Sequence, residues 1–182
     1  FSNEAGLGSA PIAAAAAKTD HPCRQALVSM TQTFLDTIVI CTMTGFILLV
    51  GGEYGKDLSG AALTAATFQK VMGPCGAYIV AISLTTFAFS TVLGWSYYGE
   101  RSAYYLFGQK GVLPYKCVFI TFSVLGAVTK DLNLVWDLSD IFNALMAIPN
   151  LIGIIGLSGV VVAETNAFLK VVQAEKEAKK AA

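Results

Sequence analysis

Long apolar runs alternate with short polar segments along most of this chain. Four of the runs reach about 20 residues, enough for a helix to cross the roughly 30 Å apolar core of a bilayer. They lie near residues 28–50, 71–98, 112–129 and 141–163. The second and the fourth contain no charged residue. The pattern therefore predicts an all-α integral membrane protein with about four transmembrane helices.

Polar segments flank these runs and divide the chain into three regions. We expect residues 1–27 to form a cytoplasmic loop with one short helix, 28–168 the transmembrane region, and 169–182 a cytoplasmic tail. In the short helix, Pro11 suits the first turn. Ser9 is expected to cap that helix, with Glu4 near its positive end.

Basic residues are unevenly shared between the two sides of the predicted bundle. One side holds Lys18, Arg24, Arg101, Lys110, Lys116, Lys170, Lys176, Lys179 and Lys180. The other side holds Lys56, Lys70 and Lys130. Because cytoplasmic loops carry an excess of lysine and arginine, both ends of the chain are predicted to be cytoplasmic.

Composition supports the membrane assignment and narrows the function. Hydrophobic residues make up 55% of the chain and charged residues 13%, against about 25% charged in soluble domains. The net charge of zero gives no indication of a nucleic-acid partner. The four cysteines form no CxxC pair, and no catalytic or metal-ligand spacing appears, so we expect neither an enzyme nor a bound cofactor. The first residue is Phe1, which suggests that the N-terminal half of a longer protein is missing.

Asp36 is the only charged residue in the first apolar run. A carboxylate in the bilayer costs several kcal/mol unless it is paired or hydrated. One interpretation is a cation or proton site, or a gating contact. The other is a structural hydrogen bond to another helix, or a hydrated position near the cytoplasmic mouth.

Hydroxyl groups are concentrated in the middle of the second apolar run. Thr86 and Ser90 are i, i+4 neighbours, as are Thr91 and Trp95. Neutral oxygens at the membrane midplane suit a dehydrated cation such as sodium, and a rigid indole with Gly94 beside it suits a small substrate. The alternative is ordinary packing, because Ser and Thr often bond the i−4 carbonyl or join helices.

In the fourth apolar run, Pro149 is expected to kink or interrupt the helix.

Several stretches resemble one transporter family. The first eleven residues, FSNEAGLGSAP, are similar to the signature of the alanine or glycine:cation symporter family. Further agreement covers FLDT and VICT (34–37 and 39–42), FAFS and GWSYYGE (87–90 and 94–100), and VWDLSD and MAIPNL (135–140 and 146–151). The resemblance extends to about Phe168, which is nearly the whole chain.

The resemblance implies a fold and a function. Family members are carriers of the bacterial and archaeal plasma membrane that import alanine or glycine with sodium, sometimes with protons. They have the inverted-repeat architecture of leucine-transporter-like proteins, with substrate and ion bound near the midplane. This chain would cover the second repeat after its first, broken helix.

The same resemblance implies site residues. Thr91 and Trp95 match substrate-pocket positions, and Thr86, Ser90 and Thr91 are candidates for the sodium site. The partners would then be a small neutral amino acid, sodium as the coupling ion, the lipid bilayer and the rest of the same chain. The alternatives are a passive channel or a non-transporting membrane scaffold subunit.

Overall fold

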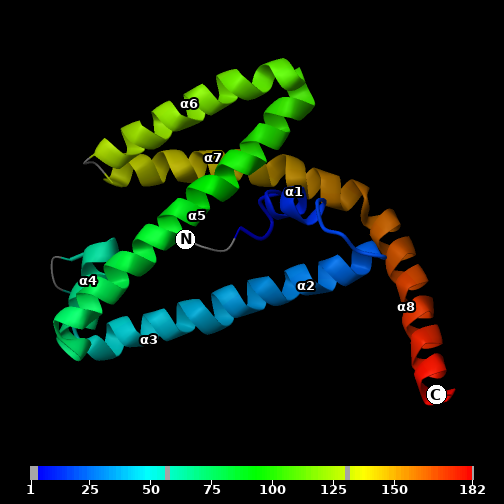
Figure 1. The fold of residues 1–182 in the computed structure, drawn as a ribbon, viewed down its shortest axis with the longest axis horizontal. Coiled ribbons are helices and arrows are strands. Elements are labelled where there is room, and N and C mark those ends of the chain that lie inside the picture. The colour runs from blue at the N-terminus through cyan, green and yellow to red at the C-terminus, as the bar shows by residue number, and fades with distance from the viewer. Residues whose placement is uncertain (1–3, 56–57, 130–131, 182) are drawn as a thin grey trace. The chain divides into compact units, whose positions relative to one another are not determined.

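The computed structural model describes residues 4–55, 58–129 and 132–181, and in this part of the chain every regular element is a helix (Figure 1). The elements are α1 (Ala10–Ala14), α2 (Pro22–Phe34), η1 (Leu35–Cys41), α3 (Thr42–Gly51), α4 (Gly60–Met72), α5 (Pro74–Phe107), α6 (Gln109–Val128), α7 (Leu132–Gly156) and α8 (Ser158–Ala181). They form two compact units: one contains α1, α2, α7 and α8, and the other runs from η1 to α6.

Four helices of the described residues are long and apolar enough to cross a membrane. They are Pro22–Gly51, Pro74–Phe107, Gln109–Val128 and Asn133–Gly156. At most 11% of the most apolar window of any of them is buried, so their apolar side chains are left to face lipid or further protein. The prediction of an all-α membrane protein with about four spans is confirmed.

The helix ends differ from the predicted runs in informative ways. The first span ends at Gly51, where Gly52 takes a left-handed conformation (φ 69°) that favours glycine. The last run does not continue as one helix to residue 163, because α7 ends at Gly156 and α8 begins at Ser158. Hydropathy averages over a window, so it does not detect a break between two apolar helical segments.

Of the two effects expected at Pro149, a kink or an interruption, the helix is not interrupted, because α7 is helical on both sides of the proline. Proline removes one backbone donor, but a membrane helix tolerates this loss where neighbouring groups satisfy the freed carbonyl.

The expected side-chain cap of α1 is wrong, since Ser9 makes no side-chain capping bond. Its Oγ instead donates to Glu4 Oε2 at 2.6 Å, and the Ser9 residue is only 1% exposed.

Helix α4 is too short to span, and its packing is specific. It contacts α3 and α5 in the second unit (Figure 1). Thr67 is fully buried and leaves room for no Cβ at Gly51, while the backbone at Phe68 lies against Gly76. Lys70 and Glu53 form an ion pair at 3.1 Å beside these contacts. Close backbone approach at two glycines therefore fixes α4 against both neighbouring helices.

Candidate functional site on helix α5

The hydroxyl groups predicted to bind a cation are arranged along one stretch of α5. Thr86 Oγ1 donates to the Ile82 carbonyl at 2.9 Å, and Ser90 Oγ donates to the Phe87 carbonyl at 2.9 Å. These bonds use the hydroxyl protons and leave the oxygen lone pairs available. Within the described residues the Thr91 hydroxyl makes no hydrogen bond, and all three side chains are exposed. The stretch thus presents oxygen acceptors of the kind that hard cations prefer.

Gly94 adjoins these hydroxyls on the helix surface. It lies four residues after Ser90 and three after Thr91, so all three share a face. Apart from its two chain neighbours and the nearby backbone of its own helix, no described residue has an atom within 4 Å of a Cβ built at Gly94. Other described side chains therefore leave this position open, and Trp95 is the next residue along the helix.

Trp95 is held by aromatic and backbone contacts rather than by the hydroxyls. Its ring makes an edge-to-face contact with Tyr98, with 6.0 Å between ring centroids. Tyr115 of α6 donates from Oη to the Trp95 carbonyl at 3.4 Å. The ring of Tyr115 occupies the place where Gly99 has no side chain. Trp95 is consequently half-buried, while the hydroxyl stretch before it is exposed.

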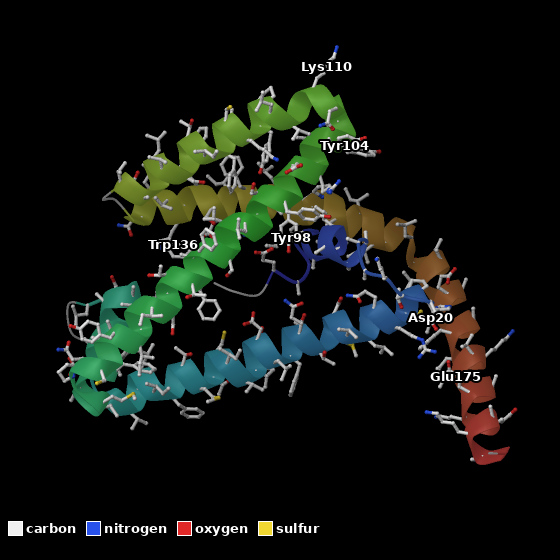
Figure 2. All side chains as sticks on the ribbon, in the orientation of Figure 1. Asp20, Tyr98, Tyr104, Lys110, Trp136 and Glu175 are labelled. Carbon is white, nitrogen blue, oxygen red and sulfur yellow. The ribbon has the colours of Figure 1, made fainter. Side chains whose placement is uncertain are left out.

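An ion pair lies beside this contact between α5 and α6. Lys116 Nζ is 2.9 Å from Glu100 Oε2, and both side chains are partly exposed. Tyr98 and Tyr104 lie along the later half of α5, and Lys110 lies at the start of α6 (Figure 2). The residue pattern did not reveal Tyr115 or the ion pair as site neighbours, because helical periodicity says nothing about which residue of a second helix meets a given position.

Asp36 lies in η1, a separate segment with π-helical hydrogen bonding. π-helical segments are rare, and they occur frequently at functional sites. Here the segment covers Leu35–Cys41 within an otherwise α-helical span from Pro22 to Gly51. The carboxylate therefore occupies a locally widened stretch of the helix, a feature that the apolar pattern did not predict.

In the other unit, the glycine-rich opening loop lies against α7. Asn150 Nδ2 donates to the Gly6 carbonyl at 2.9 Å. A Cβ at Gly8 would be 3.2 Å from Asn150 atoms, and both glycines have positive φ values, 90° and 89°. Glycine is required for this backbone, so the loop and Asn150 form a specific docking contact.

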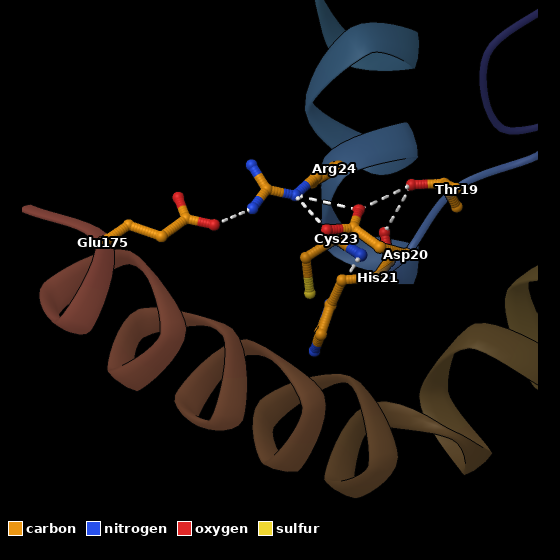
Figure 3. Close-up of polar contacts among 6 residues, drawn as sticks. All are labelled: Thr19, Asp20, His21, Cys23, Arg24 and Glu175. Carbon is orange, nitrogen blue, oxygen red and sulfur yellow. Dashed lines mark hydrogen bonds and ion pairs between the residues drawn. The ribbon is translucent and has the colours of Figure 1, made fainter. Parts of the chain in front are cut away.

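A polar cluster joins α2 to α8 in the same unit (Figure 3). Arg24 pairs with Asp20 of its own turn at 3.0 Å and with Glu175 of α8. Phe168 of α8 packs under His21 at 5.0 Å between ring centroids, and the Arg24 guanidinium lies 5.6 Å from the Phe168 ring. Phe168 is only 8% exposed, so an apolar contact lies at the centre of this mostly charged cluster.

The charge of Asp20 is favoured by its surroundings. Desolvation would by itself raise the pKa of Asp20, but backbone hydrogen bonds and the neighbouring Arg24 outweigh it and hold the pKa below its ordinary value. Asp20 thus stays ionised and keeps Arg24 directed along the start of α2.

Taken alone, the site on α5 is incomplete. Thr86, Ser90 and Thr91 supply neutral oxygens from one helix, which is fewer ligands than a dehydrated cation needs. Within the described residues, no group of three or more His, Cys, Asp or Glu side chains could hold a metal ion. The arrangement suits reversible binding of a weakly held ion and a small molecule, provided that other parts of the protein cover the exposed face.

Comparison with known proteins gives consistent matches. A model of the sodium:alanine symporter family matches residues 1–182. The sodium/alanine symporter AgcS of Methanococcus maripaludis is 62% identical over 172 residues, covering 92% of this chain and 38% of AgcS. The probable sodium/glutamine symporter GlnT of Bacillus subtilis is 44% identical over 163 residues, covering 88% of this chain and 34% of GlnT.

An uncharacterised transporter of Haemophilus influenzae is 52% identical over 172 residues, covering 93% of this chain and 38% of that protein. No solved structure matches the chain. The chain spans little more than a third of the length of these relatives.

Proposed function

Because the chain belongs to the sodium:alanine symporter family, we propose that the full-length transporter containing it imports a small neutral amino acid, alanine or glycine, together with sodium. The chain spans little more than a third of the length of these relatives, so it supplies only part of the machinery and the rest of the full-length protein supplies the remainder. The observation that carries the proposal is the stretch of α5 from Thr86 to Trp95, along which exposed hydroxyl oxygens, the open space at Gly94 and the Trp95 indole follow one another.

Each of these residues has a proposed role. Thr86, Ser90 and Thr91 contribute oxygen ligands to sodium, and Thr91, whose hydroxyl makes no hydrogen bond to the described residues, also contacts the amino acid. Trp95 forms the wall against the substrate side chain. The absent side chain at Gly94 leaves room for the substrate, and the Trp95 wall is proposed to favour glycine or alanine over larger amino acids.

Transport then requires no covalent chemistry. Sodium and the amino acid bind between the two repeats of a leucine-transporter-like fold, and the protein alternates between outward-open and inward-open states. Sodium binding favours the state that binds the amino acid, and linkage requires that the amino acid favour sodium binding by the same free energy.

The proposed setting is the plasma membrane of a bacterium or archaeon, with the C-terminal tail in the cytoplasm. The excess of lysine and arginine on one side of the spans supports this orientation. The relatives named above come from an archaeon and two bacteria. Asp36, in the π-helical segment, is proposed to act in coupling or gating.

Gradient-driven uptake into proteoliposomes that contain the full-length protein tests the proposal. Labelled alanine should accumulate above its external concentration when a sodium gradient is imposed, and should not do so with potassium in place of sodium. Ser90→Ala should raise the sodium concentration needed for half-maximal uptake, whereas Ser102→Ala on the same helix, which also bonds a backbone carbonyl, should not. Downhill flux of alanine that does not depend on sodium would instead indicate a passive channel.

A further inference from the structure

Tyr115 of α6 contacts the turn of α5 from Trp95 to Gly99 at two points. We propose that Tyr115 is a positioning residue that sets the place of Trp95 and thereby the size limit of the substrate. This inference rests on the proposed function, because it assigns the substrate wall to Trp95.

Two contacts of Tyr115 act on the same helical turn. Its Oη donates to the Trp95 carbonyl at 3.4 Å. That carbonyl also lies opposite the Gly99 amide in the α-helical pattern, so it can accept both bonds with its two lone pairs. The Tyr115 ring fills the place of the absent Gly99 side chain. The turn from Trp95 to Gly99 is therefore packed on its α6 side by Tyr115.

This turn has particular need of an external contact. Glycine inside a helix is destabilising relative to alanine because it loses more conformational freedom on folding. Because Gly94 and Gly99 flank Trp95 closely, we expect the backbone that carries the indole to be softer than a helical stretch without glycine. Contact with Tyr115 offsets this softness on one side, and Tyr98 holds the indole edge-to-face on its own helix.

A change in this turn reaches the substrate through the indole. The indole extends several ångströms from the backbone, so a small rotation of the Trp95–Gly99 turn moves the ring away from the open space at Gly94. A displaced wall admits larger side chains and contacts alanine less well. Loss of Tyr115 should therefore change substrate affinity and size selectivity rather than the rate of the transport cycle.

Transport by the full-length protein is the first part of the test. Tyr115→Phe should raise KM for alanine by no more than about twofold, because at 3.4 Å the O–H···O bond is long and belongs at the low end of the range for a neutral hydrogen bond. Tyr115→Ala should raise it further and let larger neutral amino acids compete with alanine, with Vmax per transporter little changed. In a Trp95→Ala background, Tyr115→Ala should add no further change in selectivity. Equal additional change in both backgrounds would overturn the positioning role.

A measurement that does not depend on transport completes the test. In full-length protein whose other tryptophans, including Trp136, are replaced by Phe, Tyr115→Ala should increase acrylamide quenching of Trp95 fluorescence. Lys116→Gln is the matched control, because it breaks the neighbouring ion pair with Glu100 without touching Trp95, and it should leave quenching and selectivity as in the wild type.

The outcomes separate the two hypotheses. Unchanged Trp95 quenching in Tyr115→Ala overturns the inference, whatever the transport result. Increased quenching together with wild-type selectivity in Trp95→Ala supports the positioning contact and contradicts the proposed substrate wall. A Lys116→Gln effect as large as that of Tyr115→Ala also overturns the inference, because general loosening of α5 against α6 would then explain both.

Discussion

Alanine substitutions at Gly94 and Gly99 should differ in their effect on protein stability, although both glycines lie in the same helix. A Cβ at Gly94 meets no atom of the described residues within 4 Å. A Cβ at Gly99 would overlap the Oη and Cζ atoms of Tyr115. Gly94→Ala should therefore raise the melting temperature of the full-length protein or leave it unchanged, and Gly99→Ala should lower it.

The magnitude follows from two effects. Replacing a helical glycine by alanine stabilises the helix by about 0.5–1 kcal/mol. Forcing additional atoms into a packed contact costs about 1–3 kcal/mol. Both variants gain the first term, so it cancels in their comparison. The difference between them isolates the overlap with Tyr115 and should be about 1–3 kcal/mol.

Thermal unfolding of the purified full-length transporter, with size-exclusion chromatography as the readout of the folded fraction, measures this difference. Tyr115→Ala supplies the internal check, since it removes the atoms that the new Cβ would meet. Adding Tyr115→Ala to Gly99→Ala should cost less stability than adding it to the wild type. Equal melting temperatures for Gly94→Ala and Gly99→Ala, or simple additivity with Tyr115→Ala, would refute the close contact on which the reasoning depends.

Three further predictions concern other parts of the chain. Phe168→Ala should speed tryptic cleavage at Lys170 and Lys176 by up to about a hundredfold. Truncating a buried Phe in a core costs about 3 kcal/mol or more of stability. Each factor of ten in the population of the open, cleavable state corresponds to about 1.4 kcal/mol. Glu175→Gln, which removes only a solvent-exposed pair, should change that rate much less, and the reverse order would contradict an apolar anchor. Gly51→Ala should lower the melting temperature because its Cβ would overlap buried Thr67, whereas Gly45→Ala, with open space, should not; similar losses for both would be inconsistent with this packing. Asp36→Asn should lower sodium-driven alanine uptake, as expected for the proposed coupling or gating role, and unchanged uptake would argue against that role.

Much of the fold follows from the sequence because its causes are local. Four helices are required once four runs of apolar residues must satisfy their backbone groups in lipid. The end of the first span at Gly51-Gly52 follows from the freedom of glycine to take positive φ. These features depend on a residue and its immediate neighbours, and the structure agrees with them.

The features that the sequence did not predict depend on contacts between distant residues. Ser9 was expected to cap α1 by accepting from backbone N–H groups of the first turn, but its own backbone is already helical (φ −73°, ψ −46°), and its hydroxyl is held by the bond that it donates to Glu4. Helix α4 was not predicted, because it is too short for a span and its stability comes from packing on Gly51 and Gly76. The π-helical segment around Asp36 changes the hydrogen-bond register without changing the apolar pattern.

The site residues remain predictions, yet the structure gives a reason why Trp95 is suited to its proposed role. Gly94 and Gly99 are five residues apart, so they face directions roughly 140° apart around the helix axis. One faces open space beside Ser90 and the other faces Tyr115. Trp95 directly follows Gly94 and lies one turn before Gly99, so it borders both the open face and the packed face. A side chain in this position can contact a ligand on one side only if the packing on its other side is maintained. The wall of the proposed pocket and the contact with α6 are therefore one structural unit, and a change in substrate size selectivity within the family should involve Gly99 and Tyr115 as well as Trp95.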